Sequence, residues 1–111
     1  MSLPLVFHPD YDVPLPKGHR FPMPKFALLH RYLLDTGLAE PQQLHRPDDL
    51  DNGVLHRLHD PAYVRAFDTG TLDDRAMRRI GLPWSARLAR RSRIAVAGTV
   101  RTVELAVAHG L

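Results

Sequence analysis

The stretch HRFPMPKFALLHRYLLDTGL, residues 19–38, decides the fold of the first half of this chain. It begins as a charged loop that Pro22 and Pro24 stiffen, because proline fixes its own φ and restricts the residue before it. The remainder predicts an amphipathic helix that starts near Pro24 and stops at Gly37 as a left-handed cap. Apolar side chains at i, i+3, i+7 and i+8 form its expected buried stripe, which consists of Phe26, Leu29, Leu33 and Leu34.

Two short apolar segments flank this loop and helix. Leu3–Phe7 is rich in β-compatible residues and is bounded by Pro9, so we expect a buried strand there. Residues 8–22 follow as a proline-rich loop with Gly18 as its flexible point. Leu44–Arg46 predicts a second, shorter strand that Pro47 ends.

The remaining residues predict helices. Asp48 or Asp49 is expected to cap a short helix toward Leu58, and Asp60–Pro61 opens a helix that should bury three side chains. Thr71–Asp74 has nearly the spacing of a capping box, with Gly81 closing that helix. Ser85 is expected to cap a long helix that runs to about Ala108 and closes at Gly110. The three side chains expected to be buried in the helix after Pro61 are Tyr63, Val64 and Phe67.

Composition bounds the class of protein. The chain has 111 residues, of which 44% are hydrophobic, and this is enough apolar material for about one small domain. Its net charge is +3. The chain has ten prolines, and their concentration in the first half makes that half loop-rich. The absence of cysteine excludes disulfides and thiolate chemistry. The sequence has neither a signal-peptide pattern nor an apolar run long enough to cross a membrane, so we expect a cytoplasmic protein with no membrane partner.

Four segments together resemble the zinc-dependent histone deacetylase family, in particular its bacterial, class IV-type branch. Residues 7–12 read FHPDYD and residues 19–25 read HRFPMPK, in the order of that family's first strand and following loop. Residues 58–64, LHDPAYV, are similar to the start of a family helix, and residues 97–99, AGT, lie inside a long predicted helix. The resemblance covers nearly the whole chain but only the part of the family's fold that precedes its catalytic motifs.

The resemblance implies a fold class and an activity. We expect an α/β chain that is the N-terminal part of a three-layer parallel-sheet fold of the arginase/deacetylase type, mostly helical with one or two short strands. Residues 1–111 would then be the N-terminal segment of a single deacetylase-like domain two to three times as long. The parent protein would be a zinc-dependent amidohydrolase acting on acetylated lysine or another acylated amine.

The same comparison implies that this segment holds no catalytic residue and no metal ligand. The family's zinc ligands are two aspartates and a histidine from later strands, and its general base comes from an adjacent histidine pair. None of the seven histidines here is next to another. We therefore expect the chain to be inactive alone, to bind no zinc itself, and to need the remainder of its own domain for a complete core.

The loop at residues 19–25 carries the site residues that the resemblance implies. In the family it forms one wall of the active-site mouth, and a basic residue lies near an internal cavity, which Lys25 matches as a possible holder of the product acetate. Without the family, the favoured interpretation is that the loop is a stiff connection whose Phe21 and Met23 fill the core. The expected substrate-entrance loop consists of His19, Arg20, Phe21, Pro22 and Met23.

Two further features have alternative interpretations. The arginines between residues 78 and 93 favour a small basic nucleic-acid-binding or interaction module as the competing function, although surface helices commonly carry solvated arginines and we consider nucleic acid the weaker hypothesis. Arg93 is expected to differ from the rest and point toward the sheet. The arginines in question are Arg78, Arg79, Arg87, Arg90, Arg91 and Arg93.

His56 and His59 lie one turn apart, as a pair of metal ligands would. The favoured interpretation is that His59 is buried and that its side chain is hydrogen-bonded to the backbone.

The long helix at the C-terminal end is apolar nearly all round from Ile94 to Val107, which is typical of a buried helix. Gly98 lies in its interior and costs about 1 kcal/mol relative to alanine there. Its presence predicts a close crossing by another backbone segment. If the strands that this helix should cover are absent, part of its apolar surface must be exposed.

Overall fold

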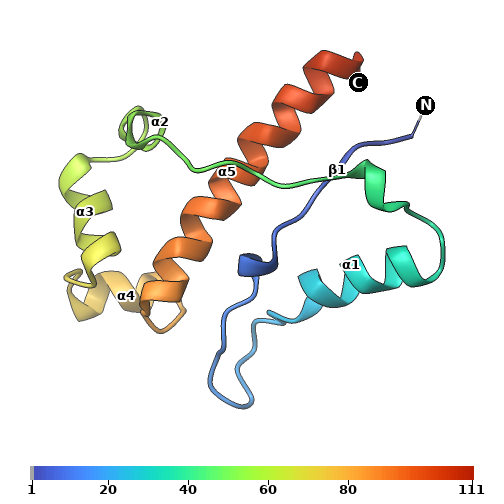
Figure 1. Cartoon of the computed structure of the whole chain (residues 1–111). Coiled ribbons are helices and arrows are strands. Elements are labelled where there is room, and N and C mark those ends of the chain that lie inside the picture. Colours follow the sequence, from blue (N-terminus) through green and yellow to red (C-terminus); the bar gives the residue numbers. More distant parts are fainter. Residues whose placement is uncertain (1) are drawn as a thin grey trace.

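The computed structural model describes residues 2–111 (Figure 1), in which a long helix crosses the molecule with three short helices on one side and one helix on the other. The elements in chain order are β1 (Leu5–Val6), the 3-10 turn η1 (Pro9–Tyr11), α1 (Lys25–Asp35), the 3-10 turn η2 (Pro41–Gln43), β2 (Leu44–His45), α2 (Asn52–His56), α3 (Pro61–Thr69), α4 (Asp74–Ile80) and α5 (Ala86–His109).

The two strands form a minimal parallel sheet. Leu5 pairs with Leu44 and Val6 with His45, and the Phe7 amide extends the ladder by donating to the His45 carbonyl at 3.0 Å. The helix α1 is the crossover between them, as a parallel connection requires. Both strands are half-buried rather than buried.

The expected three-layer parallel-sheet fold is wrong for this chain. Across residues 2–111 the structure is mostly helical, and its one sheet has two strands of two residues each. Three layers need a sheet broad enough to be covered by helices on both faces. Here Pro4 and Pro9 bound the first strand and Pro47 follows the second, and proline removes the amide that a longer ladder would use.

The helix ends follow local capping rules and largely confirm the sequence prediction. Ser85 Oγ accepts from the Leu88 amide at 3.0 Å, and α5 closes at Gly110 in the left-handed conformation. Asp60 caps α3 by accepting from the Ala62 amide at 2.7 Å. Two caps differ from the prediction: Asp51 caps α2, and Asp73 rather than Thr71 caps α4, because their carboxylates reach free amides two and three residues ahead.

The core lies along α5. Leu88, Ala89, Ile94, Ala97 and Leu105 are buried where α5 meets η1, β1 and α3. The remaining surface of α5 is partly open, since Val96, Val103 and Val107 are 37%, 57% and 77% exposed. The partial exposure expected for this helix is therefore observed.

Gly98 lies at a close crossing on α5, but the expected crossing by another backbone segment is wrong. A Cβ built on Gly98 would overlap the Tyr11 hydroxyl and lie 3.2 Å from Tyr11 Cζ and 3.7 Å from Val6 Cγ1. The element that crosses is thus a side chain of η1 rather than a neighbouring backbone. Glycine is required here because a larger side chain has no space. The helical backbone conformation itself does not require glycine.

Several expected burials did not occur. Within residues 25–35 no side chain is fully buried, and Leu29 is 58% exposed beside the exposed Leu28 and Tyr32. Tyr63 on α3 is 43% exposed, and His59 is exposed and stacks on it at 6.4 Å between ring centroids. Those predictions were wrong because the outer faces of α1 and α3 have nothing packed over them in this chain.

The overall dimensions confirm an open structure. The radius of gyration is 15.9 Å and the accessible surface 7939 Å². A compact domain of this size is expected near 13 Å and about 6,200 Å². Within residues 2–111, no helix is long and apolar enough to span a membrane.

Candidate functional site

A hollow of about 460 Å³ lies where the first long loop meets the start of α5. We call it the loop hollow. Val13, Leu15, Phe21 and Met23 give it apolar walls, and Arg87 reaches it from the first turn of α5. The remaining residues that line it are Asp12, Pro14, Pro16, Gly18, His19 and Pro24.

Three of the five predicted substrate-entrance residues line this hollow. They are His19, Phe21 and Met23, whereas Arg20 and Pro22 are exposed beside it. Met23 is only 2% exposed and anchors the loop in the core. The loop at residues 19–25 therefore has both predicted features: Met23 fills the core, and His19, Phe21 and Met23 form a wall of the loop hollow.

Local hydrogen bonds hold the loop and define the state of its histidine. His19 Nδ1 accepts from the Phe21 amide at 3.1 Å, and the Met23 amide donates to the Phe21 carbonyl at 2.9 Å. A neutral imidazole whose Nδ1 accepts carries its proton on Nε2. His19 therefore offers one N–H donor on the ring edge opposite the loop backbone.

Arginines of α5 fix the chain segment before the hollow. Arg90 Nε donates to Asp10 Oδ2 at 2.7 Å, and Arg91 Nε donates to the Tyr11 carbonyl at 3.0 Å. The Arg90 hydrogen bond lowers the pKa of Asp10, and the same bond raises the pKa of Arg90. Burial raises the pKa of the Tyr11 phenol, with the nearby Arg91 charge opposing. These contacts hold η1 on α5.

Lys25 lies at the surface, next to the aromatic side chains of the loop. Its Nζ is 5.1 Å from the ring centroids of both Phe21 and Phe26, and the Arg91 guanidinium carbon lies 5.7 Å and 5.4 Å from the same rings. Two cations therefore share two rings, each contact being a cation–π interaction. A role for Lys25 at an internal cavity stays a prediction for the larger protein.

Tyr11 continues the aromatic cluster inward from Phe26, at 6.0 Å between ring centroids. Phe7 meets Tyr11 edge-on at 5.9 Å and stacks on His30 at 4.0 Å. The first strand, η1, the loop and α1 are therefore joined through their aromatic side chains, and the loop hollow lies beside a supported wall.

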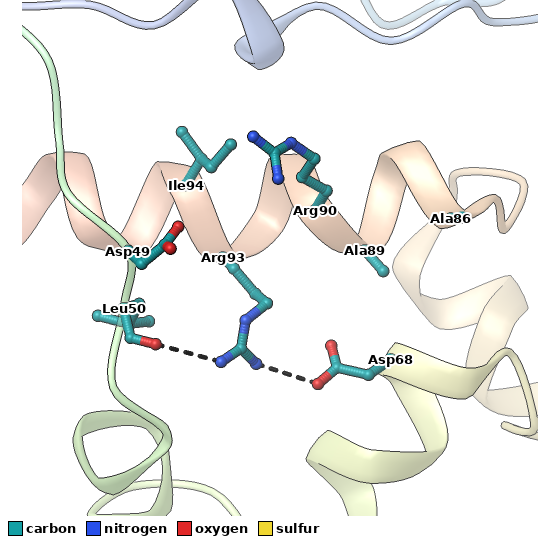
Figure 2. Close-up of a pocket in the computed structure, with 8 residues that line it drawn as sticks. All are labelled: Asp49, Leu50, Asp68, Ala86, Ala89, Arg90, Arg93 and Ile94. Atoms are coloured by element: carbon teal, nitrogen blue, oxygen red, sulfur yellow. Dashed lines mark hydrogen bonds and ion pairs between the residues drawn. The ribbon is translucent and has the colours of Figure 1, made fainter.

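A second hollow, of about 480 Å³, lies between α5, α3 and the segment before α2 (Figure 2). Figure 2 shows Arg93 pointing from α5 toward Asp68 and Leu50, with Arg90 directed away from them. Arg93 donates to Asp68 Oδ2 at 3.0 Å, to the Leu50 carbonyl at 3.2 Å, and to Asn52 Oδ1. The expectation that Arg93 points toward the sheet is wrong, because its partners lie on α3, at the start of α2 and in the loop before α2.

The arginine cluster is divided by these contacts. Arg90, Arg91 and Arg93 are each bonded within the chain at 2.7–3.0 Å. Arg87 makes only a bond of 3.5 Å to the Asp12 carbonyl, at the outer limit of a hydrogen bond. Arg78 is on the separate helix α4. The cluster is therefore not one continuous phosphate-binding face.

Among residues 2–111, no three His, Cys, Asp or Glu side chains gather as a metal site. His56 and His59, the two histidines one turn apart, are exposed in and after α2.

Sequence reasoning missed Arg87 and Asp12 as residues of the hollow. A signal was present, because residues 87, 90 and 91 follow the i, i+3, i+4 spacing that puts side chains on one helix face. Asp12 had no comparable signal, since it reaches the hollow only through the path of the loop.

No known protein-family model matches this chain. An uncharacterized protein of Picosynechococcus sp. is 51% identical to it over all 111 residues. The chain spans 37% of the length of that relative, so the similar protein is more than twice as long.

Proposed function

We propose that this chain is the N-terminal part of a zinc-dependent amidohydrolase that hydrolyses acetylated lysine or a similar acylated amine. The observation that carries the proposal is the loop hollow. Segments 7–12 and 19–25, which carry the strongest resemblance to deacetylases, meet at this hollow although they are separate in sequence. In such an enzyme zinc polarises the acyl carbonyl and activates water.

The role of this segment in the proposed enzyme is to form and stiffen one wall of the substrate mouth. Met23 anchors the loop, and the bond from Arg91 to the Tyr11 carbonyl holds η1 against α5. A rigid wall favours catalysis because misplacing a substrate by about 1 Å can cost roughly a hundredfold in rate. The metal ligands and general base are assigned to the rest of the protein.

The large exposed surface supports the proposal that this chain needs the rest of the protein to complete its core. The surface exceeds that of a compact domain of this mass by roughly 1,700 Å², comparable with the area buried in a standard protein interface. The exposed side chains Leu28, Leu29 and Val107 lie on two different helices. We expect the isolated chain to bind an apolar dye or to self-associate, and a dye-free monomer with a sharp melt would contradict this.

The direct test uses the longer relative from Picosynechococcus sp., which contains a region 51% identical to this chain. The purified protein should release acetate from a fluorogenic acetyl-lysine peptide, lose activity with a chelator and regain it with zinc. The 111-residue chain with zinc is the matched control and should show no turnover. A zinc-loaded relative that is inactive on a panel of acylated amines would refute the proposal.

The competing hypothesis, a basic nucleic-acid-binding module, has a separate test. It requires affinity that falls steeply as salt rises, with a slope set by the number of phosphates neutralised. Gel-shift titrations of this chain at two salt concentrations measure that slope. Tight, salt-dependent binding would favour the nucleic-acid-binding module. The intramolecular bonds of Arg90, Arg91 and Arg93 argue against it, because they occupy donors that phosphates would need.

A further inference from the structure

The loop hollow contains a cation with little to bind inside the chain. Arg87 has no carboxylate within 4.0 Å among residues 2–111, and its one hydrogen bond, to the Asp12 carbonyl, is 3.5 Å long. The neighbouring arginines on α5 are bonded at 2.7–3.0 Å. Arg87 thus keeps most of its five N–H donors available.

The position of Arg87 at the start of α5 favours an anion. It is the second residue of α5, in the turn where the helix dipole is positive and a cation is disfavoured. Within the chain, the Asp10 carboxylate attracts Arg87 by its charge but accepts no hydrogen bond from it. An anion placed beside Arg87 would meet both the guanidinium donors and the positive end of the helix.

The walls of the hollow indicate what else the ligand contains. Val13, Leu15, Phe21 and Met23 are apolar, and the volume of about 460 Å³ is that of a small-molecule site. His19 offers an Nε2–H donor, because its Nδ1 accepts from the Phe21 amide. A planar guanidinium prefers a carboxylate or phosphate, which it holds through two parallel bonds.

We propose that the loop hollow binds a carboxylate attached to an apolar body, with Arg87 as the residue that recognises the carboxylate. If the proposed function holds, on which this part rests, the substrate is an acylated amine that also carries a free carboxylate, such as an N-acyl amino acid. Asp12 also lines the hollow and carries the opposing charge.

The test is binding to the 111-residue chain, measured by equilibrium dialysis. The probes are N-acetylphenylalanine and its neutral amide, which share the apolar body and differ in the carboxylate. The wild-type chain should bind the acid about tenfold more tightly than the amide, the ratio that one charge-assisted hydrogen bond supports. Arg87→Gln should bring the ratio to about one, and Arg87→Lys should keep part of it.

A matched control removes a charge elsewhere. Arg79→Gln lowers the net charge equally, but Arg79 is on α4 and does not line the loop hollow, so the preference for the acid should survive. Asp12→Asn should increase the affinity for the acid and leave the affinity for the amide unchanged, because it removes from the hollow a charge of the same sign as the carboxylate. Far-ultraviolet circular dichroism shows whether each variant keeps its helices.

Several outcomes overturn the proposal. These are equal binding of acid and amide, no binding of either at millimolar concentration, an acid preference that Arg87→Gln leaves intact, and tighter binding of phenyl phosphate than of the acid. The proposed enzymatic function fails separately, since an inactive long relative leaves the binding result of this chain untouched.

Discussion

Replacing Gly98 with alanine tests the close approach of the Tyr11 side chain to α5. Two effects oppose each other. Alanine in a helix interior is favoured over glycine by about 1 kcal/mol. The new methyl group, however, would overlap the Tyr11 hydroxyl, and forcing an extra carbon into a packed site costs about 1–3 kcal/mol.

The steric cost should prevail, because Tyr11 cannot simply move aside. Its ring is held edge-on by Phe7 and Phe26, and its backbone carbonyl accepts from Arg91. We expect Gly98→Ala to lower the free energy of unfolding by about 1–2 kcal/mol. In a Tyr11→Phe background the obstructing oxygen is gone and the nearest remaining atom is Tyr11 Cζ at 3.2 Å. There the same substitution should be neutral or stabilising by up to about 1 kcal/mol.

Urea unfolding followed by far-ultraviolet circular dichroism measures all four proteins of this cycle. Gly53→Ala is the control, because Gly53 is also helical with an ordinary φ and its Cβ would meet only the side chain of Asp51. The interaction energy between positions 98 and 11 should be about 2 kcal/mol, within the range for residues in contact. If Gly98→Ala stabilises the wild-type chain as much as the Tyr11→Phe chain, the proposed crossing is wrong.

Three further predictions concern single contacts. Arg93→Met removes the bonds that join α5 to α3 and the loop before α2, and should lower the free energy of unfolding by about 1–3 kcal/mol in urea titrations, less at high salt. The Arg90 hydrogen bond lowers the pKa of Asp10, so this carboxylate adds stability above its ordinary pKa of 3.8 that is lost as pH falls through the lowered pKa. Arg90→Gln should raise the Asp10 pKa, followed by NMR, and an unchanged titration would contradict the contact. Trp84→Phe deletes the 2.6 Å bond from the indole to the Phe67 carbonyl and should cost about 1 kcal/mol, whereas an unchanged urea midpoint would show that this bond is not formed in solution.

Much of the candidate site was predictable, but its charge was not. The loop at residues 19–25 was expected to form a wall, and His19, Phe21 and Met23 do line the hollow. Arg87 was grouped with five other arginines, because sequence spacing shows only which residues share a helix face. Which arginine keeps free donors depends on where Asp10, Asp68 and the Tyr11 carbonyl lie in space.

Local chemistry explains what the sequence by itself determined. The ends of α5 follow from Ser85 and Gly110, and the start of α3 follows from Asp60, because a cap interacts with residues only two or three positions away. The space requirement at Gly98 was also predictable, since a glycine in a helix interior costs stability that must be offset elsewhere.

Only the tertiary structure decided which apolar faces are covered. Leu29 had the spacing of a core residue and is 58% exposed, while Met23 in a loop is 2% exposed. Periodicity identifies a face that benefits from burial, but burial itself needs a partner that arrives from a distant part of the chain. The tertiary structure likewise limited the sheet to two residues per strand, because parallel pairing requires partners far apart in sequence and proline ends each segment early.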